Sequence, residues 1–174
     1  MKEAILNAGI KLFAKNAYAD VSVDSIVESA GISKGTFYYY FKSKDEFFKS
    51  ILAHAFENLI NIYDSNSKNL NTADDKLHAF VKAVFLSFKN DKNLFFIIQK
   101  ELVKIVIGEE SGFLDYQKKI FELLKSILNS QEDIVCYYVM GILRSSIIYH
   151  LKTNEPLMIV QMKAWECIKK ILGW

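Results

Sequence analysis

The chain has 174 residues, of which 51% are hydrophobic and 24% are charged, and its formal net charge at pH 7 is +2. One proline and seven glycines, beside abundant Leu, Ile, Lys, Glu and Ala, favour an all-helical globular fold and argue against a β-sandwich, which needs more turn residues. The small net charge excludes a globally basic surface, so any affinity for nucleic acid must come from a local arrangement of charges.

Two cysteines and the hydropathy of the chain bear on its compartment. Cys136 and Cys167 lie 31 residues apart with no further Cys or His at ligand spacing, and no signal peptide precedes the first helix. No uninterrupted apolar run reaches the roughly 18 residues of a membrane span. We therefore expect a soluble, reduced, cytoplasmic protein without a membrane partner. Both thiols fall on apolar helical faces, where inert buried thiols are favoured over a redox switch.

The first predicted helix covers residues 2–16. Ile5, Ala8, Leu12 and Phe13 form an apolar stripe along it. Packed across the next two helices, it completes a three-helix unit of about 45 residues, which is small enough to need further packing for stability.

Residues 22–44 are predicted to form two short helices joined by a tight turn. Ser22 can cap the first helix by accepting from an amide one turn on, and Ser33 can cap the second in the same way. Gly31 between them can enter the left-handed conformation that ends a helix. Two short helices around a glycine turn predict a helix-turn-helix, whose second helix enters the major groove of DNA.

The second of these helices carries more polar and aromatic surface than folding requires. Phe37 and Phe41 share one face by their i, i+4 spacing, so the tyrosines at 38–40 cannot all be buried. Gly35 costs about 1 kcal/mol relative to Ala inside a helix, which is reasonable where a backbone must approach a ligand closely. Lys44 follows near the helix end, where a cation suits both the dipole and a phosphate. The alternative is an ordinary helical hairpin that packs on other helices.

Residues 2–50 resemble the DNA-binding region of the TetR family of bacterial transcriptional regulators. The resemblance is carried by ILNAGIKLFAKNAYADVSVDSIVESAGISKGTFYYYFKSKDEFF, in which SKGTFYYYFKSK combines cap, glycine, aromatic run, core Phe and terminal Lys in one register. It implies one group of residues at base edges and one at phosphates, with Tyr39 in either role. The base-edge group is Lys34, Gly35 and Thr36, and the phosphate group is Ser22, Ser33, Tyr38, Tyr40 and Lys44. The family usually has Gly where this chain has Ala17, so the first helix ends either in a strained left-handed residue or in another way.

The central part of the chain predicts a connecting helix over 45–63 and then a polar loop, Asp64–Thr72. Further apolar helices are expected over 73–90, 93–107 and 113–128, with a turn at 108–112. The predicted fold is thus an N-terminal three-helix domain, 1–44, followed by a helical ligand-binding and dimerisation domain, 45–174, with about nine helices in total.

The last two predicted helices, 132–151 and 156–172, differ from the others because the first is apolar on nearly all sides. Such a helix must be buried all round, and a chain of this size has too little of its own surface to cover both. We expect a homodimer through these helices, as in proteins of the resembled family. Gly141, Ser145 and Ser146 would permit close approach. The alternative is that both helices fill the core of the second domain.

The aromatic content of the second domain suggests a pocket for a small apolar or weakly polar effector, since few inward positions are charged. Core packing remains the alternative role for any one of these side chains. The predicted effector-binding residues are Phe80, Phe88, Phe95, Phe96, Gln99, Tyr116, Phe121, Tyr138 and Tyr149.

No predicted site supports catalysis, and we expect no metal and no cofactor. The histidines at 54, 78 and 150 lie on separate helices, and the sequence has no nucleophile elbow or phosphate loop. The leading hypothesis is a ligand-responsive DNA-binding regulator, a repressor released from a palindromic operator in double-stranded DNA. The alternatives are an activator of the same fold, and a helical small-molecule-binding or protein-interaction module without sequence-specific DNA binding. The sequence identifies neither the effector nor the operator.

Overall fold

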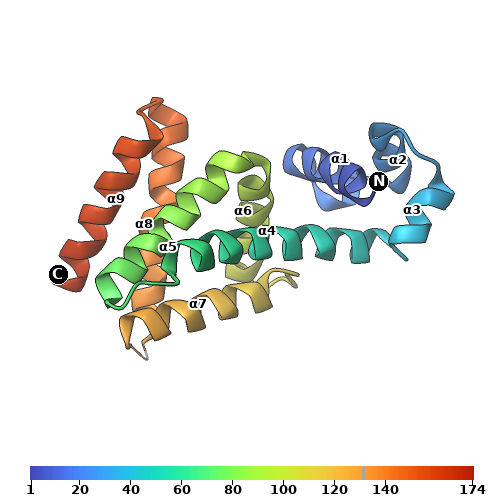
Figure 1. Ribbon diagram of the computed structural model, residues 1–174. Coiled ribbons are helices and arrows are strands. Elements are labelled where there is room, and N and C mark those ends of the chain that lie inside the picture. Colours follow the sequence, from blue (N-terminus) through green and yellow to red (C-terminus); the bar gives the residue numbers. More distant parts are fainter. Residues whose placement is uncertain (131) are drawn as a thin grey trace. The chain divides into compact units, whose positions relative to one another are not determined.

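The computed structural model describes residues 1–130 and 132–174, and within that part the chain folds entirely into helices (Figure 1). This confirms the predicted all-α fold with its N-terminal helix-turn-helix. Nine α-helices and one short 3-10 helix are described there. They are α1 (Lys2–Lys15), the 3-10 helix (Tyr18–Asp20), α2 (Val23–Ala30), α3 (Lys34–Tyr40), α4 (Lys44–Ser67), α5 (Ala73–Asn90), α6 (Lys92–Val106), α7 (Leu114–Leu128), α8 (Asp133–Thr153) and α9 (Leu157–Leu172).

The turn between α2 and α3 forms as its sequence predicts. The Ser22 hydroxyl accepts from the Ser25 amide at 3.0 Å, and the Ser33 hydroxyl accepts from the Thr36 amide at 3.1 Å. Gly31 follows α2 with φ of 66°, which is the left-handed conformation that a residue without Cβ adopts at no steric cost. The local sequence therefore sets both ends of the turn.

Helix α1 ends without a left-handed residue, which answers the question raised by Ala17. Asn16 and Ala17 are both extended, with φ of −113° and −69°, and the Asn16 amide nitrogen donates back to the Leu12 carbonyl at 3.0 Å. The Lys100 ammonium, on α6, donates to the carbonyl oxygens of Phe13, Ala14 and Asn16 at 2.9, 3.0 and 2.9 Å. A side chain from another helix thus satisfies the carbonyls that α1 leaves without a partner.

Helix α4 runs longer than predicted, so the first half of the expected loop at 64–72 is wrong. The helix continues to Ser67, and within it the side chains of Ser65 and Asn66 donate hydrogen bonds to the carbonyls of Asn61 and Ile62, one turn back. These residues are poor helix formers when they compete with the backbone, yet here they bond within the helix. The loop is confined to 68–72.

The chain divides into two compact units that do not coincide with the predicted domains. The first unit comprises residues 1–57 and 91–116, and the second comprises residues 58–90 and 117–174. The first unit thus adds the start of α4 and all of α6 to the helix-turn-helix, because α6 packs on α1. The boundary at residue 44 remains a prediction about which part binds DNA.

Aromatic rings fill the core of the first unit. Phe13, Phe37 and Phe47 are fully buried or nearly so, and the ring centroids of Phe37 and Phe47 lie 5.3 Å apart in an edge-to-face pair. Gly9 in α1 makes room for this cluster, since a Cβ there would come within 2.3 Å of the Phe47 ring. Helix α3 is therefore anchored in the core of the first unit through the face that carries Phe37.

In the second unit α8 packs along α9, and α5 packs on both (Figure 1). The His78 ring of α5 stacks on the Trp165 ring of α9, with centroids 4.7 Å apart. Pro156 precedes α9 as its N-cap residue instead of occupying the predicted first helical position.

Helix α8 is the one described helix whose length and hydropathy would suffice for a membrane span, although only 22% of its apolar window is buried within the chain. One such helix is weak evidence for a membrane. The low burial shows that the all-round apolar helix is not covered by its own chain.

Candidate nucleic-acid interface and effector site

The predicted DNA-binding residues of α3 divide between an exposed face and its margins. Lys34, Gly35, Tyr38 and Tyr39 are exposed, and their spacing of four places Lys34 beside Tyr38 and Gly35 beside Tyr39 on the solvent side of the helix. The Tyr39 side chain is the extreme case, with 82% of its surface accessible. Thr36 and Tyr40 are half-buried beside this face. The helix therefore presents a cation, a bare backbone and two phenols to solvent.

Gly35 is not required by the packing of the chain. It lies in helical conformation, and a Cβ added there would meet only the Ser33 hydroxyl oxygen, at 3.7 Å. Gly35 is the second residue of α3. No contact within the described chain requires a glycine at this position.

The predicted phosphate-binding hydroxyls have second tasks in the fold. Ser33 and Thr36 hydroxyl oxygens lie 3.0 Å apart, and Ser33 also caps α3. Ser22 caps α2 through its bond from the Ser25 amide. A hydroxyl that accepts from a cap amide still has one O–H to donate, so capping and phosphate binding are compatible.

Lys44 has a role that sequence reasoning missed. Its ammonium donates to the carbonyls of Tyr18 and Val21 at 3.0 and 2.9 Å and lies 4.3 Å from the centroid of the Tyr18 ring. Lys44 therefore holds the connection between α1 and α2 in place. Its predicted contact with a phosphate stays a prediction, and one N–H of the ammonium remains for it.

Lys34 is paired in the absence of DNA. Its ammonium lies 2.6 Å from the Asp24 carboxylate on α2, and both side chains are more than half exposed. The hydrogen bond that the Lys34 ammonium donates to the Asp24 carboxylate raises the pKa of Lys34. The residue predicted to read a base edge is thus already oriented by an acid.

Glu101 is a buried carboxylate that no sequence pattern singled out. Only 2% of it is accessible, and its oxygens accept from the Lys104 ammonium at 2.6 Å, the Ser111 hydroxyl at 2.9 Å and the Gly112 amide at 3.2 Å. The sequence pattern that could have indicated this ion pair is a single acid, Glu101, three residues before Lys104 in an otherwise apolar helix. No local pattern could have indicated the role of the neighbouring Lys100, because the carbonyls that Lys100 binds lie more than eighty positions away in the sequence.

The predicted effector residues fall in both units, and the described contacts do not bring all nine together. In the first unit, Phe95, Phe96, Gln99 and Tyr116 lie on α6 and at the start of α7. The Gln99 side-chain oxygen is buried without a hydrogen-bond partner, which is unfavourable unless a ligand supplies a donor. Gln99 therefore fits the predicted role of a polar fixture.

In the second unit the remaining five predicted residues have two different environments. Phe80, Phe88 and Phe121 are buried in the core, as the packing alternative expects. Tyr138 and Tyr149 are half exposed and line a groove between α8 and α9. Phe80, Phe88 and Phe121 are not among the residues that line this groove. Helical spacing does not distinguish an aromatic residue that points into the core from one on an outer face.

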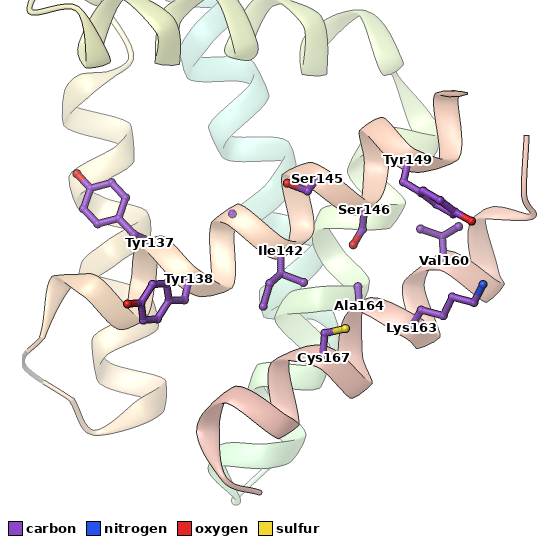
Figure 2. A pocket seen from close by; sticks show the side chains of 11 residues that line it. Tyr137, Tyr138, Ile142, Ser145, Ser146, Tyr149, Val160, Lys163, Ala164 and Cys167 are labelled. Atoms are coloured by element: carbon purple, nitrogen blue, oxygen red, sulfur yellow. The ribbon is translucent and has the colours of Figure 1, made fainter. Parts of the chain in front are cut away.

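The groove between α8 and α9 has a volume of about 680 Å³ and is open and mostly apolar. Figure 2 shows Ser146 and Ile142 of α8 facing Ala164 and Cys167 of α9, with Tyr149 and Lys163 at one end and Tyr138 at the other. The small residues predicted to permit close approach lie here. Its complete lining is Tyr137, Tyr138, Gly141, Ile142, Ser145, Ser146, Tyr149, Val160, Lys163, Ala164 and Cys167.

The prediction of two buried thiols is half wrong. Cys136 is buried, its thiol donates to the Phe121 carbonyl at 3.7 Å, and burial raises its pKa. Cys167 is exposed in the groove, because the apolar face of α9 on which it lies is not covered by the chain. Among the described residues, no three His, Cys, Asp or Glu side chains are grouped as a metal site would require.

The sequence and the fold of this chain are both similar to those of known bacterial regulatory proteins. The model of bacterial regulatory proteins of the tetR family matches residues 5–51, which are α1 to the start of α4. The fatty acid metabolism regulator protein of Bacillus subtilis is 30% identical over 131 residues, which are 75% of this chain and 64% of that protein. The chain thus spans less than two thirds of the length of the curated relatives it matches.

Solved structures share the whole fold. A transcriptional regulator of Aquifex aeolicus superposes with a TM-score of 0.71 at 26% identity, over 98% of both chains. The regulator FadR of Bacillus subtilis, solved in complex with stearoyl-CoA, superposes with a TM-score of 0.70 at 19% identity, over 97% of both chains. These relatives are transcriptional regulators and not enzymes. The helix-turn-helix region of this chain, residues 5–51, is therefore that of the TetR family of bacterial regulatory proteins.

Proposed function

We propose that this protein is a homodimeric, ligand-responsive transcriptional regulator that represses by binding a palindromic operator. The observation that carries the proposal is the exposed face of α3, where a helix glycine with no internal purpose lies between an exposed lysine and two exposed tyrosines. Such a face suits a DNA groove, because the bare backbone at Gly35 allows close approach while Lys34 reaches the base edges.

The dimer rests on the groove between α8 and α9. Large apolar side chains such as Tyr137, Met158 and Met162 are exposed along these two helices, by 53, 71 and 62%. An exposed apolar surface of this kind, with small residues at its centre, is covered in a stable protein by a partner. A second copy of the chain supplies the same surface and would place two recognition helices about 34–36 Å apart, in successive major grooves.

For the effector we propose a compound with a long acyl chain. The fatty acid metabolism regulator of Bacillus subtilis is a relative, and the related FadR structure holds stearoyl-CoA. In this chain, Gln99 offers one buried oxygen without a partner on a largely apolar helix, which suits an apolar ligand with a single donor. Ligand binding favours a dimer whose recognition helices no longer match the operator, acting through α4, so operator affinity falls.

The test of DNA binding uses Gly35→Ala. The operator is selected from random duplexes and from the DNA upstream of the coding region, and binding is measured by gel shift at several salt concentrations. Because the fold leaves room for the new methyl group, the variant keeps or gains stability, whereas operator affinity falls at least tenfold if DNA approaches that backbone. Tyr38→Ala should weaken binding to all duplexes.

Two results would contradict the proposal. If wild-type protein gives no saturable shift at moderate salt, the helix-turn-helix is a packing unit of an interaction module. If Gly35→Ala and Tyr38→Ala both bind as the wild type does, the α3 face is not the interface.

The effector is tested by thermal shift with palmitoyl-CoA, coenzyme A alone and palmitate. A ligand at 100 times its dissociation constant adds about 2.7 kcal/mol. The acyl-CoA should raise the melting temperature and release the operator, and coenzyme A alone should do neither. Gln99→Leu should reduce the shift. No shift with palmitoyl-CoA or palmitate would remove acyl compounds as effectors and leave the DNA assignment intact.

A further inference from the structure

The ion pair between Asp24 and Lys34 joins the two helices of the helix-turn-helix on the face where DNA is proposed to bind. The carboxylate lies in the first turn of α2 and the ammonium at the first residue of α3, with 2.6 Å between Oδ1 and Nζ. Both side chains are open to solvent, by 69 and 59%. Exposed pairs contribute little to folding, so stability does not account for this one.

Lys34 is also poorly placed for the stability of its own helix. The N-terminal end of a helix carries partial positive charge, so a cation there is unfavourable, and the first turn of α3 contains no acid to balance it. Asp24 supplies the missing negative charge from α2. The lysine is thus kept in an unfavourable position by an acid on the neighbouring helix.

We propose that Asp24 is a specificity-determining residue that positions Lys34 for a base edge and competes with DNA phosphates for its ammonium. The inference rests on the proposed DNA-binding function. An ammonium has three N–H donors, so Lys34 can keep one bond to Asp24 while it donates to the O6 and N7 acceptors of a guanine. Asp24 then fixes the direction of the side chain.

On non-cognate DNA the same carboxylate acts against binding. Lys34 has no correct base acceptor there, so its ammonium can contribute only through a phosphate. The Asp24 carboxylate already neutralises that ammonium, and its own negative charge repels the phosphate. The pair therefore lowers non-specific affinity more than operator affinity. Selectivity is a difference between these two affinities, so the acid raises it.

The experiment compares Asp24→Asn with Glu28→Gln in the full-length dimer. Glu28 is an exposed acid one turn further along α2, so its variant makes the same change of net charge and helix but leaves the pair intact. Dissociation constants for the selected operator and for a shuffled duplex are measured by fluorescence anisotropy between 50 and 300 mM salt. Melting temperatures of both variants confirm folding.

Asp24→Asn should bind the shuffled duplex about three- to tenfold more tightly, with a salt slope steeper by about one unit for one more phosphate contact. Operator affinity changes less, so the ratio of the two constants falls at least threefold. Glu28→Gln should strengthen binding to both duplexes by the same factor and keep the ratio. In a Lys34→Gln background, Asp24→Asn should leave the ratio unchanged, because the residue through which it acts is absent.

Equal effects of Asp24→Asn and Glu28→Gln would overturn the inference and leave the proposed function standing, since only net charge would then matter. A change of ratio that persists in the Lys34→Gln background would also overturn it. Wild-type protein that does not distinguish any selected operator from the shuffled duplex would overturn the proposed function and this inference together.

Discussion

Replacement of Lys100 by methionine tests how the helix-turn-helix is held. The ammonium binds three carbonyl oxygens at the end of α1, those of Phe13, Ala14 and Asn16. Methionine keeps most of the apolar stem and removes all three donors. The end of α1 then has no cap beyond the Asn16 side chain, which bonds to Leu12.

The expected loss follows from the surroundings of each carbonyl. The Phe13 carbonyl is partly buried, and loss of a charged donor there costs about 1–2 kcal/mol, because water replaces it incompletely. The other two bonds are exposed, so water takes them over at little cost. Removal of a cation from a helix C-terminus adds about 0.3–1 kcal/mol. Burial of the Lys100 ammonium is itself unfavourable, and this desolvation lowers the pKa of Lys100 in the fold. Methionine avoids that cost, so part of the lost stability is recovered.

The net loss is about 2 kcal/mol, which for a chain of this length lowers the melting temperature by roughly 4–8 °C. The assay is thermal unfolding followed by circular dichroism, with amide hydrogen exchange of α1 as a local measure. Lys15→Met is the matched control, since Lys15 lies in the last turn of α1 and is exposed. It removes a cation from the same helix end without those three bonds. If Lys100→Met loses no more stability than Lys15→Met, the three-carbonyl cap does not stabilise the fold.

Three further predictions concern other parts of the fold. Glu101→Gln should cost about 1.5–3 kcal/mol in urea unfolding, because it removes a buried charged acceptor while Lys104, which is 32% exposed, can be hydrated. Gly141→Leu should weaken the dimer in analytical ultracentrifugation without unfolding the chain, because a Cβ there meets no atom within 4 Å. Desolvation lowers the pKa of His78 from 6.5, so the unfolded chain takes up its proton first; stability should be full above pH 6.5 and fall as pH drops through the lowered value. His78→Phe, which can still stack on Trp165, should reduce that loss between pH 7 and pH 5.

Each of these has a control within the chain. Glu166→Gln breaks an i, i+3 pair with Lys169 in which the carboxylate is 59% exposed, so equal costs for both variants would contradict the assignment of Glu101. Gly141→Ala should weaken the dimer less than Gly141→Leu does, and equal dimer affinity in all three proteins would remove the groove from the interface. His54→Gln is the control for the loss of one imidazole, because His54 is exposed on α4. The same pH dependence in His78→Phe as in the wild type would show that other groups cause it.

The sequence predicted best where the determining contacts lie within a few residues of one another. Ser22, Ser33 and Gly31 set the ends of α2 and α3 through bonds to neighbours within five positions. Helical periodicity placed the inward Phe37 correctly for the same reason. The prediction of a loop was wrong at Ser65 and Asn66, whose side chains can bond either to a nearby loop backbone or to a carbonyl one turn back in a helix.

The roles of the lysines could not be read from the sequence. Lys34, Lys44 and Lys100 look alike in the sequence, yet Lys34 pairs with Asp24 while the other two bind backbone carbonyls. Lys100 binds those at the end of α1, and Lys44 binds those of the connection to α2. Their partners lie 10 to more than 80 positions away, and a long flexible side chain reaches whichever acceptor the packing brings near.

The sequence by itself determined the all-helical fold, the helix-turn-helix and its exposed aromatic face, because helix periodicity, caps and turn residues act over short distances. Tertiary structure alone decided the carbonyl cap by Lys100, the buried carboxylate of Glu101 and the separation of Tyr138 and Tyr149 from the aromatic core. These features depend on which helices pack together. The periodicity of a sequence predicts that a helix has an apolar face, but it does not predict which surface covers that face.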